Sequence, residues 1–249
     1  ISQIETVIKE EPKLTHFFFV HHETTTGMLN PLAEILELCE KYELDSIVDA
    51  MSSYAGLPID LQRQPIDYLI SSSNKCIQGM AGVSFVIANK ERLEATSNVQ
   101  PRNLYLNLWG NHSYIEQTGQ FQFTPPVQIV YALDQALDEF FIETQSGRTA
   151  RYIKSYETLL EGIEQTGLEM LLPESQHSKL LTAIVEPKSA KYNFKEMHDH
   201  FYENDVTIYP GKGANKDTFR IANIGAIDYR DMKVFNELML QYFQEIKII

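Results

Sequence analysis

The sequence is poor in cysteine, in tryptophan and in basic residues. Its 249 residues include two cysteines and one tryptophan, and 21 lysines and arginines stand against 34 aspartates and glutamates, which gives a formal net charge of −13. An acidic surface repels a phosphate backbone, so this balance argues against a nucleic-acid partner. It also disfavours binding to an anionic membrane surface.

Long hydrophobic runs are also missing. The longest apolar stretches, such as residues 17–20, have the length of a strand and fall far short of the roughly 20 residues that cross a bilayer. We therefore expect no membrane partner. Cys39 and Cys76 lie in unlike surroundings without metal ligands at the usual spacing, which favours reduced thiols and a cytoplasmic location. His21 and His22 also lack such partners, so we expect no metal.

The first half of the chain alternates strand-like and helix-like segments. A helix is expected to begin at Asn30-Pro31, with Asn30 as its N-cap, because apolar residues then recur at helical spacing. The strand-like runs are residues 17–21, 46–49, 68–71 and 83–88. This alternation predicts an α/β core with a mainly parallel sheet, and ligands of such sheets bind at the carboxyl ends of the strands.

The second half indicates a smaller α+β unit. Helices are predicted after Pro125-Pro126, from about residue 149 to 165 with Gly167 as the closing residue, at residues 194–202, and at the C-terminus. The strand-like runs between them are residues 168–172, 181–185, 206–209 and 219–221. We place the domain boundary after residue 146, with residues 1–146 as part of a large domain and residues 147–249 as a small one.

Two polar residues follow strand-like runs of the first half. Asp49 ends the run 46–49, and Lys75 lies 75 − 49 = 26 residues later, just after the run 68–71. Both side chains should emerge at one rim of the sheet. A lysine amine can form a Schiff base with an aldehyde, and a carboxylate can pair with a protonated pyridine nitrogen. The pair therefore suits a pyridoxal phosphate site, although each residue alone is commonly a surface lysine or a turn aspartate.

A set of segments in a fixed order resembles a known family. The segments are Glu-Thr-Thr-Thr-Gly-Met-Leu-Asn-Pro at 23–31, Asp-Ala-Met-Ser-Ser at 49–53, Ser-Asn-Lys-Cys-Ile-Gln-Gly at 73–79, Phe-Thr-Pro-Pro at 123–126, Ile-Tyr-Pro-Gly-Lys at 208–212 and Thr-Phe-Arg-Ile at 218–221. They resemble class V aminotransferases of fold type I, over essentially the whole chain. The form of residues 74–79 is most similar to the branch that uses 2-aminoethylphosphonate and pyruvate.

The resemblance implies a role for each matched residue. Lys75 would hold pyridoxal phosphate and shuttle a proton, Asp49 would pair with the pyridine nitrogen, and Thr26 would contact the ring hydroxyl. Thr124 would reach the cofactor phosphate from the other subunit of a homodimer, and Arg220 would bind the acidic group of the substrate. Without the resemblance, Thr26 is equally a turn residue, Thr124 an N-cap, and Arg220 the partner of a surface carboxylate.

The chain also departs from the family pattern. Gln122 stands where the family usually has an arginine. Family members carry roughly a hundred further residues at their N-terminus, including a glycine-rich loop for the cofactor phosphate, and we expect this chain to be the C-terminal piece of a longer protein that binds the cofactor weakly by itself. Two alternatives stay open: a related aminotransferase of the serine– or alanine–glyoxylate type, and an inactive fragment.

Overall fold

The computed structural model describes residues 1–211 and 217–249. These residues form two compact units, and the chain passes between them several times. The last crossing, between residues 138 and 139, leads into the longest segment of unit 2. Unit 1 contains Ile1–Val20, Pro31–Met51 and Ile59–Asp138, and unit 2 contains His21–Asn30, Ser52–Pro58 and Glu139–Ile249.

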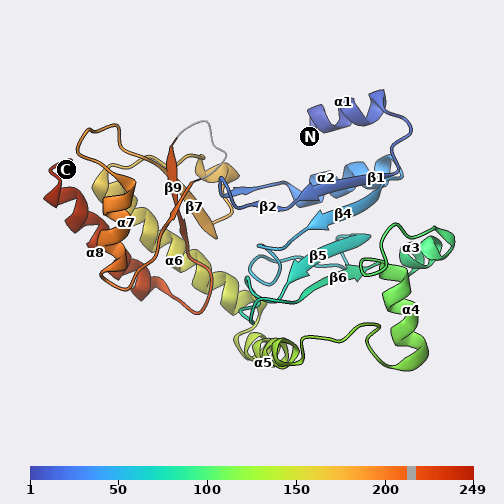
Figure 1. The fold of residues 1–249 in the computed structure, drawn as a ribbon. Coiled ribbons are helices and arrows are strands. Elements are labelled where there is room, and N and C mark those ends of the chain that lie inside the picture. Colours follow the sequence, from blue (N-terminus) through green and yellow to red (C-terminus); the bar gives the residue numbers. More distant parts are fainter. Residues whose placement is uncertain (212–216) are drawn as a thin grey trace. The chain divides into compact units, whose positions relative to one another are not determined.

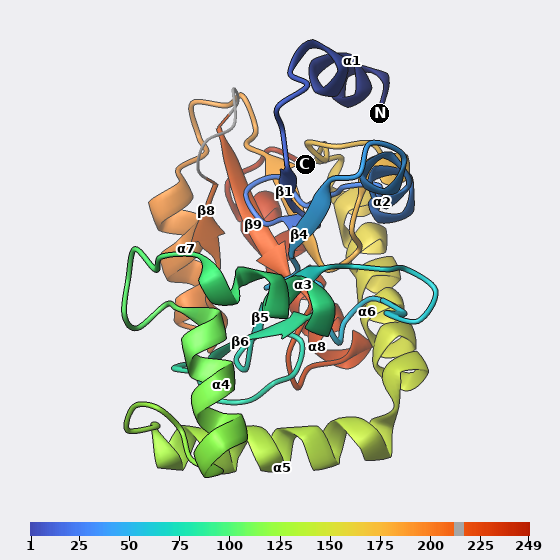
Figure 2. The ribbon, with the colours of Figure 1, turned by 90° about the vertical axis from the view of Figure 1, so that its right-hand side faces the viewer.

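Unit 1 is built around a four-stranded sheet with the order β1-β4-β5-β6 (Figures 1 and 2). The β1–β4 and β4–β5 pairs are parallel, and β6 runs antiparallel to β5. The predicted mainly parallel sheet is therefore confirmed, and each predicted strand is found with its ends shifted by no more than one residue. The strands are β1 (His16–Val20), β4 (Asp45–Asp49), β5 (Tyr68–Ser72) and β6 (Ser84–Ala88).

Helix α2 (Leu32–Lys41) packs on β4 through the apolar side chains that the sequence placed on one face. Leu32, Ile35, Leu36 and Cys39 are all buried. The predicted N-cap is wrong, because Pro31 and not Asn30 caps this helix and no side chain contributes. The backbone N–H of Asn30 donates to the carbonyl of His21 (2.8 Å), so Asn30 continues the preceding strand pairing instead.

The other helices of unit 1 were predicted only in part. α5 (Val127–Glu143), whose last residues belong to unit 2, begins directly after Pro126 as expected, and α1 (Ser2–Glu10) is the first helix of the chain. The sequence reasoning missed α3 (Lys90–Ala95), the short 3₁₀ turn η1 (Thr96–Asn98) and α4 (Leu108–Thr118). Asn89 and Asn107 cap α3 and α4 with their side chains, and these caps were the available signal.

Unit 2 combines a three-stranded antiparallel sheet with three longer helices (Figure 1). The sheet order is β7-β9-β8, and α6 and α8 pack against each other along it. The elements are β2 (His22–Glu23), β3 (Met28–Leu29), α6 (Gln145–Thr166), η2 (Glu174–Gln176), β7 (Leu181–Val185), α7 (Phe194–Tyr202), β8 (Tyr209–Pro210), β9 (Thr218–Ala222) and α8 (Tyr229–Glu245).

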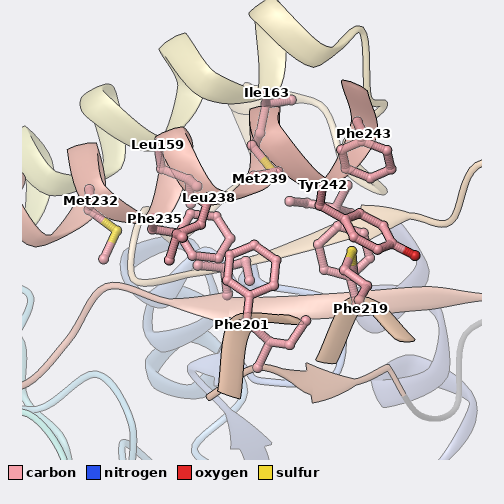
Figure 3. Packing of buried hydrophobic residues seen from close by; sticks show 14 residues of the cluster. Leu159, Ile163, Phe201, Phe219, Met232, Phe235, Leu238, Met239, Tyr242 and Phe243 are labelled. Carbon is pink, nitrogen blue, oxygen red and sulfur yellow. The ribbon is translucent and has the colours of Figure 1, made fainter. Parts of the chain in front are cut away.

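A dense aromatic core holds unit 2 together (Figure 3). Phe201 of α7 stacks on Phe235 of α8 with ring centroids 4.9 Å apart. Gly162 of α6 lets the side chain of Asn236 approach closely, since an added Cβ would lie 2.2 Å from Asn236 Oδ1. This close approach explains how α6 and α8 lie side by side, and Asn236 Nδ2 donates to the carbonyl of Thr158 (2.6 Å).

Three boundaries in unit 2 differ from the predicted ones. Residues 168–172 form no strand, because only Met170 makes a bridge, to Ile184. Helix α6 begins at Gln145 and not at 149, since the side chain of Thr144 accepts a hydrogen bond from Gly147 N and caps the helix earlier. The run 206–209 contributes only the start of β8. Short apolar runs predict burial better than they predict strand pairing.

Candidate functional site

Asp49 is the last residue of β4 and lies at the carboxyl end of the parallel pairs. It is paired in register with Ile70 of β5 and with Val20 of β1. Asp49 is half-buried, and its Oδ1 accepts a hydrogen bond from Met51 N (2.9 Å). The next residue, Ala50, continues the pairing by donating its N–H to Ile70 O (2.9 Å). The backbone on both sides of the carboxylate is therefore fixed.

Lys75 lies in the loop that follows the neighbouring strand β5. Asn74 and Lys75 are exposed, whereas Cys76 and Ile77 are buried at 0% and 2% exposure. Among the residues that the structure describes, the Lys75 amine has no hydrogen-bond or ion-pair partner. The two buried neighbours anchor the loop, and the amine is left accessible.

Hydrogen bonds within the loop fix the backbone on which Lys75 stands. Gly79 N donates to Ser73 O (2.8 Å), and Gln78 N donates to Lys75 O (2.9 Å). The Ser73 hydroxyl lies 2.5 Å from Met80 O and 3.1 Å from Val83 O, so it ties the start of the loop to its end. The loop is closed on both sides, which limits the positions open to the Lys75 backbone.

Helix α5 packs against the same loop from within unit 1. An added Cβ on Gly82 would lie 2.4 Å from the end of the Ile129 side chain, and one on Gly79 would lie 3.6 Å from the Leu133 Cα. Gly82 also has φ +131°, a conformation that favours glycine. Glycine at position 82 therefore allows the close contact between α5 and the loop, whereas a Cβ at position 79 would make an ordinary van der Waals contact with Leu133.

These residues fit the ring end of pyridoxal phosphate. A lysine with an unengaged amine and a carboxylate with one oxygen in use lie at the same edge of one sheet, after adjacent parallel strands. Ser72, three residues before Lys75, has a buried hydroxyl oxygen that finds no hydrogen-bond partner in the described part of the chain. No role was predicted for Ser72, although the serine run at 71–73 indicates a polar strand end.

Thr26 lies in unit 2, in the turn between β2 and β3. Gly27 closes this turn with φ +85° by donating its N–H to Glu23 O (2.8 Å). Thr26 is half-buried, and its hydroxyl oxygen accepts a hydrogen bond from Met28 N (3.3 Å). Its own O–H has no acceptor among the residues placed by the structure, so it can donate to a ligand oxygen.

Arg220 lies on β9 of unit 2 and is held by two backbone carbonyls. Its Nη1 donates to Thr24 O (3.1 Å), and its Nε donates to Pro210 O (3.2 Å). A guanidinium carries five N–H groups, so 5 − 2 = 3 of them have no acceptor within residues 1–211 and 217–249. The side chain is pre-positioned and still has donors for an anion.

Thr124 lies in unit 1, three residues before the first residue of α5, and it is exposed. The nearby Gln122 has a buried side-chain oxygen without a hydrogen-bond partner in the described chain. The structure thus groups Asp49, Lys75 and Thr124 in unit 1. It groups Thr26 and Arg220 in unit 2. Lys212, the last residue of the segment 208–212, lies outside the described residues.

His21 and His22 are engaged in a buried polar cluster of unit 2. His21 Nδ1 lies 2.9 Å from Ser53 Oγ, and His22 Nε2 lies 2.9 Å from Ser178 Oγ. Burial lowers the pKa of His21 to about 4, with a smaller contribution from the neighbouring His22. Burial likewise lowers the pKa of His177 to about 4. No group of three potential metal ligands occurs in the part of the chain that is described.

The sequence of this chain matches a known protein family. The family model of the class V aminotransferases matches residues 1–205. The chain belongs to this family. The predicted fold type I α/β fold is confirmed, because solved aminotransferase structures superpose on 97–99% of the chain. Among the described residues, no helix combines the length and the hydrophobicity that a membrane crossing needs.

Two relatives with similar sequences share one name. A 2-aminoethylphosphonate–pyruvate transaminase of Klebsiella pneumoniae is 42% identical over 228 residues, which is 91% of this chain and 62% of that protein. One from Vibrio cholerae is 40% identical over 238 residues, 94% of this chain and 64% of that protein. The chain therefore spans somewhat less than two thirds of the length of these relatives.

Solved aminotransferase structures are similar in fold at lower sequence identity. An alanine–glyoxylate aminotransferase from Nostoc sp. has a TM-score of 0.86 at 22% identity and covers 97% of this chain and 64% of its own. A pyridoxamine–pyruvate aminotransferase from Mesorhizobium loti has a TM-score of 0.83 at 22% identity, with coverages of 99% and 63%. At such identity the likeness supports the fold and leaves the substrate open.

Proposed function

We propose that this class V chain belongs to an enzyme that transfers the amino group of 2-aminoethylphosphonate to pyruvate. The products are phosphonoacetaldehyde and L-alanine, and the reaction serves phosphonate catabolism. The observation that carries the proposal is the exposed, unengaged Lys75 on a rigid loop beside the strand that ends in Asp49. The choice of substrate rests on the name shared by the relatives at 40–42% identity.

Pyridoxal 5'-phosphate is the cofactor that suits these residues. When bound, it supplies an electron sink for the negative charge that develops on the substrate carbon. Lys75 would hold the cofactor through its Nζ amine, and the same amine, once freed by the substrate amine, would move the proton at the substrate carbon. The Asp49 carboxylate keeps a proton on the pyridine nitrogen, because a negative charge beside that nitrogen favours its protonated form.

Three further residues complete the proposed assignment. The Thr26 hydroxyl would donate a hydrogen bond to the ring oxygen of the cofactor. Arg220 binds phosphonate in one half-reaction and carboxylate in the other, since its planar fork of N–H groups fits both anions. Thr124 contacts the cofactor phosphate of the other subunit in a homodimer, and its exposure beside α5 is compatible with that role.

The setting of the reaction follows from the same family assignment. We place the enzyme in the cytoplasm, where the two buried cysteine thiols remain reduced. Residues 1–146 are proposed as part of the large cofactor-binding domain and residues 147–249 as the small domain. The net charge of −13 disfavours a nucleic-acid partner, and none is proposed.

Amino-donor screening tests the proposed function. The purified chain is supplied with excess pyridoxal phosphate and pyruvate, and alanine formation is measured with 2-aminoethylphosphonate and, in parallel, with serine. We expect alanine from 2-aminoethylphosphonate only. Equal use of serine would assign the chain to the amino acid–glyoxylate type, and absence of transfer from every donor would identify an inactive fragment.

A further inference from the structure

The turn between β2 and β3 links two residues of the proposed site. It presents Thr26, and the carbonyl of Thr24, two residues earlier, accepts the hydrogen bond from Arg220 Nη1 (3.1 Å). All of these residues belong to unit 2. The conformation of this four-residue turn therefore affects both the proposed contact of Thr26 with the cofactor and the proposed contact of Arg220 with the substrate.

The C-terminal side of this turn is fixed by tight packing. An added Cβ on Gly27 would lie 2.3 Å from Leu181 O, and the carbonyl of Gly27 accepts a hydrogen bond from Ser178 N (2.8 Å). Met28 forms a β-bridge with His177. These contacts fix the turn at Gly27 and Met28. They do not involve residues 24 and 25, whose conformation must depend on other contacts.

The side chain of Glu23 supplies that order. Its Oε1 accepts hydrogen bonds from both Thr25 N (2.9 Å) and Thr25 Oγ1 (2.8 Å). A carboxylate oxygen makes stronger hydrogen bonds than a neutral acceptor, and here one oxygen binds the residue that lies between Thr24 and Thr26. The Glu23 carbonyl also accepts the hydrogen bond from Gly27 N.

We propose that Glu23 is a positioning residue, whose carboxylate fixes the turn so that Thr24 O supports Arg220 while Thr26 faces the cofactor. The inference rests on the proposed function, because it assigns Arg220 to the substrate anion. Glu23 itself touches neither substrate nor cofactor. Its removal lets residues 24 and 25 move, so Arg220 loses one of its two carbonyl supports and binds an anion more weakly.

Two variants of Glu23 and two reference variants separate positioning from charge. Glu23→Ala removes both hydrogen bonds to Thr25, whereas Glu23→Gln keeps an oxygen acceptor and loses the charge. Glu157→Ala removes a charge from an exposed site on α6 of the same unit and serves as the matched control. Arg220→Ala defines the signal that anion binding at the arginine produces.

Two measurements are made on each protein. The first is amide hydrogen exchange of residues 24–28, and the second is binding of ethylphosphonate, which lacks the reacting amine, by phosphorus NMR line broadening. For Glu23→Ala we expect exchange about tenfold faster and binding about tenfold weaker, as for the loss of roughly one net charge-assisted hydrogen bond. Glu23→Gln should restore both to within about threefold, and Glu157→Ala should match the unaltered chain.

Each contrary result has a distinct meaning. Unchanged exchange of residues 24–28 in Glu23→Ala would show that the carboxylate does not order the turn. Exchange in Glu23→Gln that stays as fast as in Glu23→Ala would show that the negative charge at residue 23, and not an oxygen acceptor alone, orders the turn. Ethylphosphonate binding that falls with Arg220→Ala but not with Glu23→Ala contradicts the inference and leaves the proposed function intact. Binding that is equal in the unaltered chain and Arg220→Ala contradicts both.

Discussion

The two units bury their apolar side chains differently. In unit 2, side chains from α6, α7, α8 and the antiparallel sheet form one continuous core with Phe201, Phe219 and Met239 at 0% exposure. In unit 1, α2 covers one face of the sheet, where Val48 is fully buried. On the opposite face, Phe18 is 58% exposed, and residues of β4, β5 and β6 line a cavity of about 610 Å³.

The unit with the larger core is therefore not the unit that carries the residues assigned to the reacting end of the cofactor. Parallel sheets are normally covered on both faces, so unit 1 gains less from its sheet than unit 2 gains from its core. Yet Asp49 and Lys75, which are assigned to the reacting end of the cofactor, belong to unit 1. Arg220, whose N–H groups are assigned to the acidic group of the substrate, belongs to unit 2. In unit 1 local hydrogen bonds and buried neighbours, more than a large core, fix the backbone at Asp49 and Lys75.

The largest expected effect comes from removing the Lys75 amine. Lys75→Ala should lower the rate of alanine formation by at least roughly 10³-fold, because both bonding to the cofactor and proton transfer depend on this group. Lys90→Ala, which removes an exposed lysine of α3 in the same unit, should leave the rate unchanged. A variant at Lys75 that keeps near-normal transfer would place the chemistry elsewhere.

The next effect tests the difference in burial directly. Phe201→Ala in unit 2 should lower the free energy of unfolding by about 3–5 kcal/mol, since it leaves a cavity in a filled aromatic core. Phe18→Ala in unit 1 removes the same atoms from an exposed site and should change it by less than about 0.5 kcal/mol. Urea unfolding followed by circular dichroism measures both. Equal losses would mean that the two units do not differ as described.

Acid should weaken unit 2 through its buried histidines. The folded-state pKa of His21 and His177 is lowered to about 4 by burial, so the unfolded chain binds more protons as the pH falls below 6.5. The stabilisation is complete above pH 6.5 and is lost progressively between pH 6.5 and about pH 4, by up to about 3 kcal/mol for His21.

A variant isolates this contribution from that of the carboxylates. In the unaltered chain the backbone N–H of Lys179 donates to His177 Nδ1 (2.9 Å). His177→Asn keeps an acceptor for this N–H, but the asparagine side chain does not titrate in this pH range. We expect urea unfolding of the variant to depend less on pH between 6.5 and about 4 than that of the unaltered chain. An identical pH dependence would show that His177 is not a buried neutral histidine.

The smallest effect concerns a cap in unit 1. Asn107 Oδ1 accepts a hydrogen bond from Gly110 N (3.0 Å) at the start of α4, so Asn107→Ala should cost about 1 kcal/mol. Trp109, the single tryptophan, lies in the same helix and reports its unfolding by fluorescence. Asn107→Gly should cost only a few tenths of a kcal/mol. If both variants matched the unaltered chain, α4 would not depend on this cap.

The sequence predicted the elements that carry strong periodic patterns. The four strands of unit 1, α2 and α7 follow from runs of apolar residues at the spacing of a strand or a helix, and the positions of Asp49 and Lys75 at strand ends followed from them. The α3 and α4 helices were missed because α4 contains no buried residue and α3 buries only Leu93, so neither has an apolar face that periodicity can detect.

The contacts around the site needed the three-dimensional arrangement. The bond from Arg220 to Thr24 joins residues 220 − 24 = 196 positions apart, and no local pattern encodes it. The role of Ser73 in closing the Lys75 loop likewise depends on where β6 returns beside β5. The assignment of roles to Thr26, Thr124 and Arg220 came from family resemblance, and these roles stay predictions.

The central claim is that Lys75 binds the cofactor aldehyde. The most direct measurement treats the chain with pyridoxal phosphate, reduces the mixture with borohydride, and maps the labelled peptide by mass spectrometry. We predict that the label lies on Lys75 and is absent from that peptide in Lys75→Ala. A label spread over other lysines, or no label on the peptide that contains residues 73–79, would contradict the assignment.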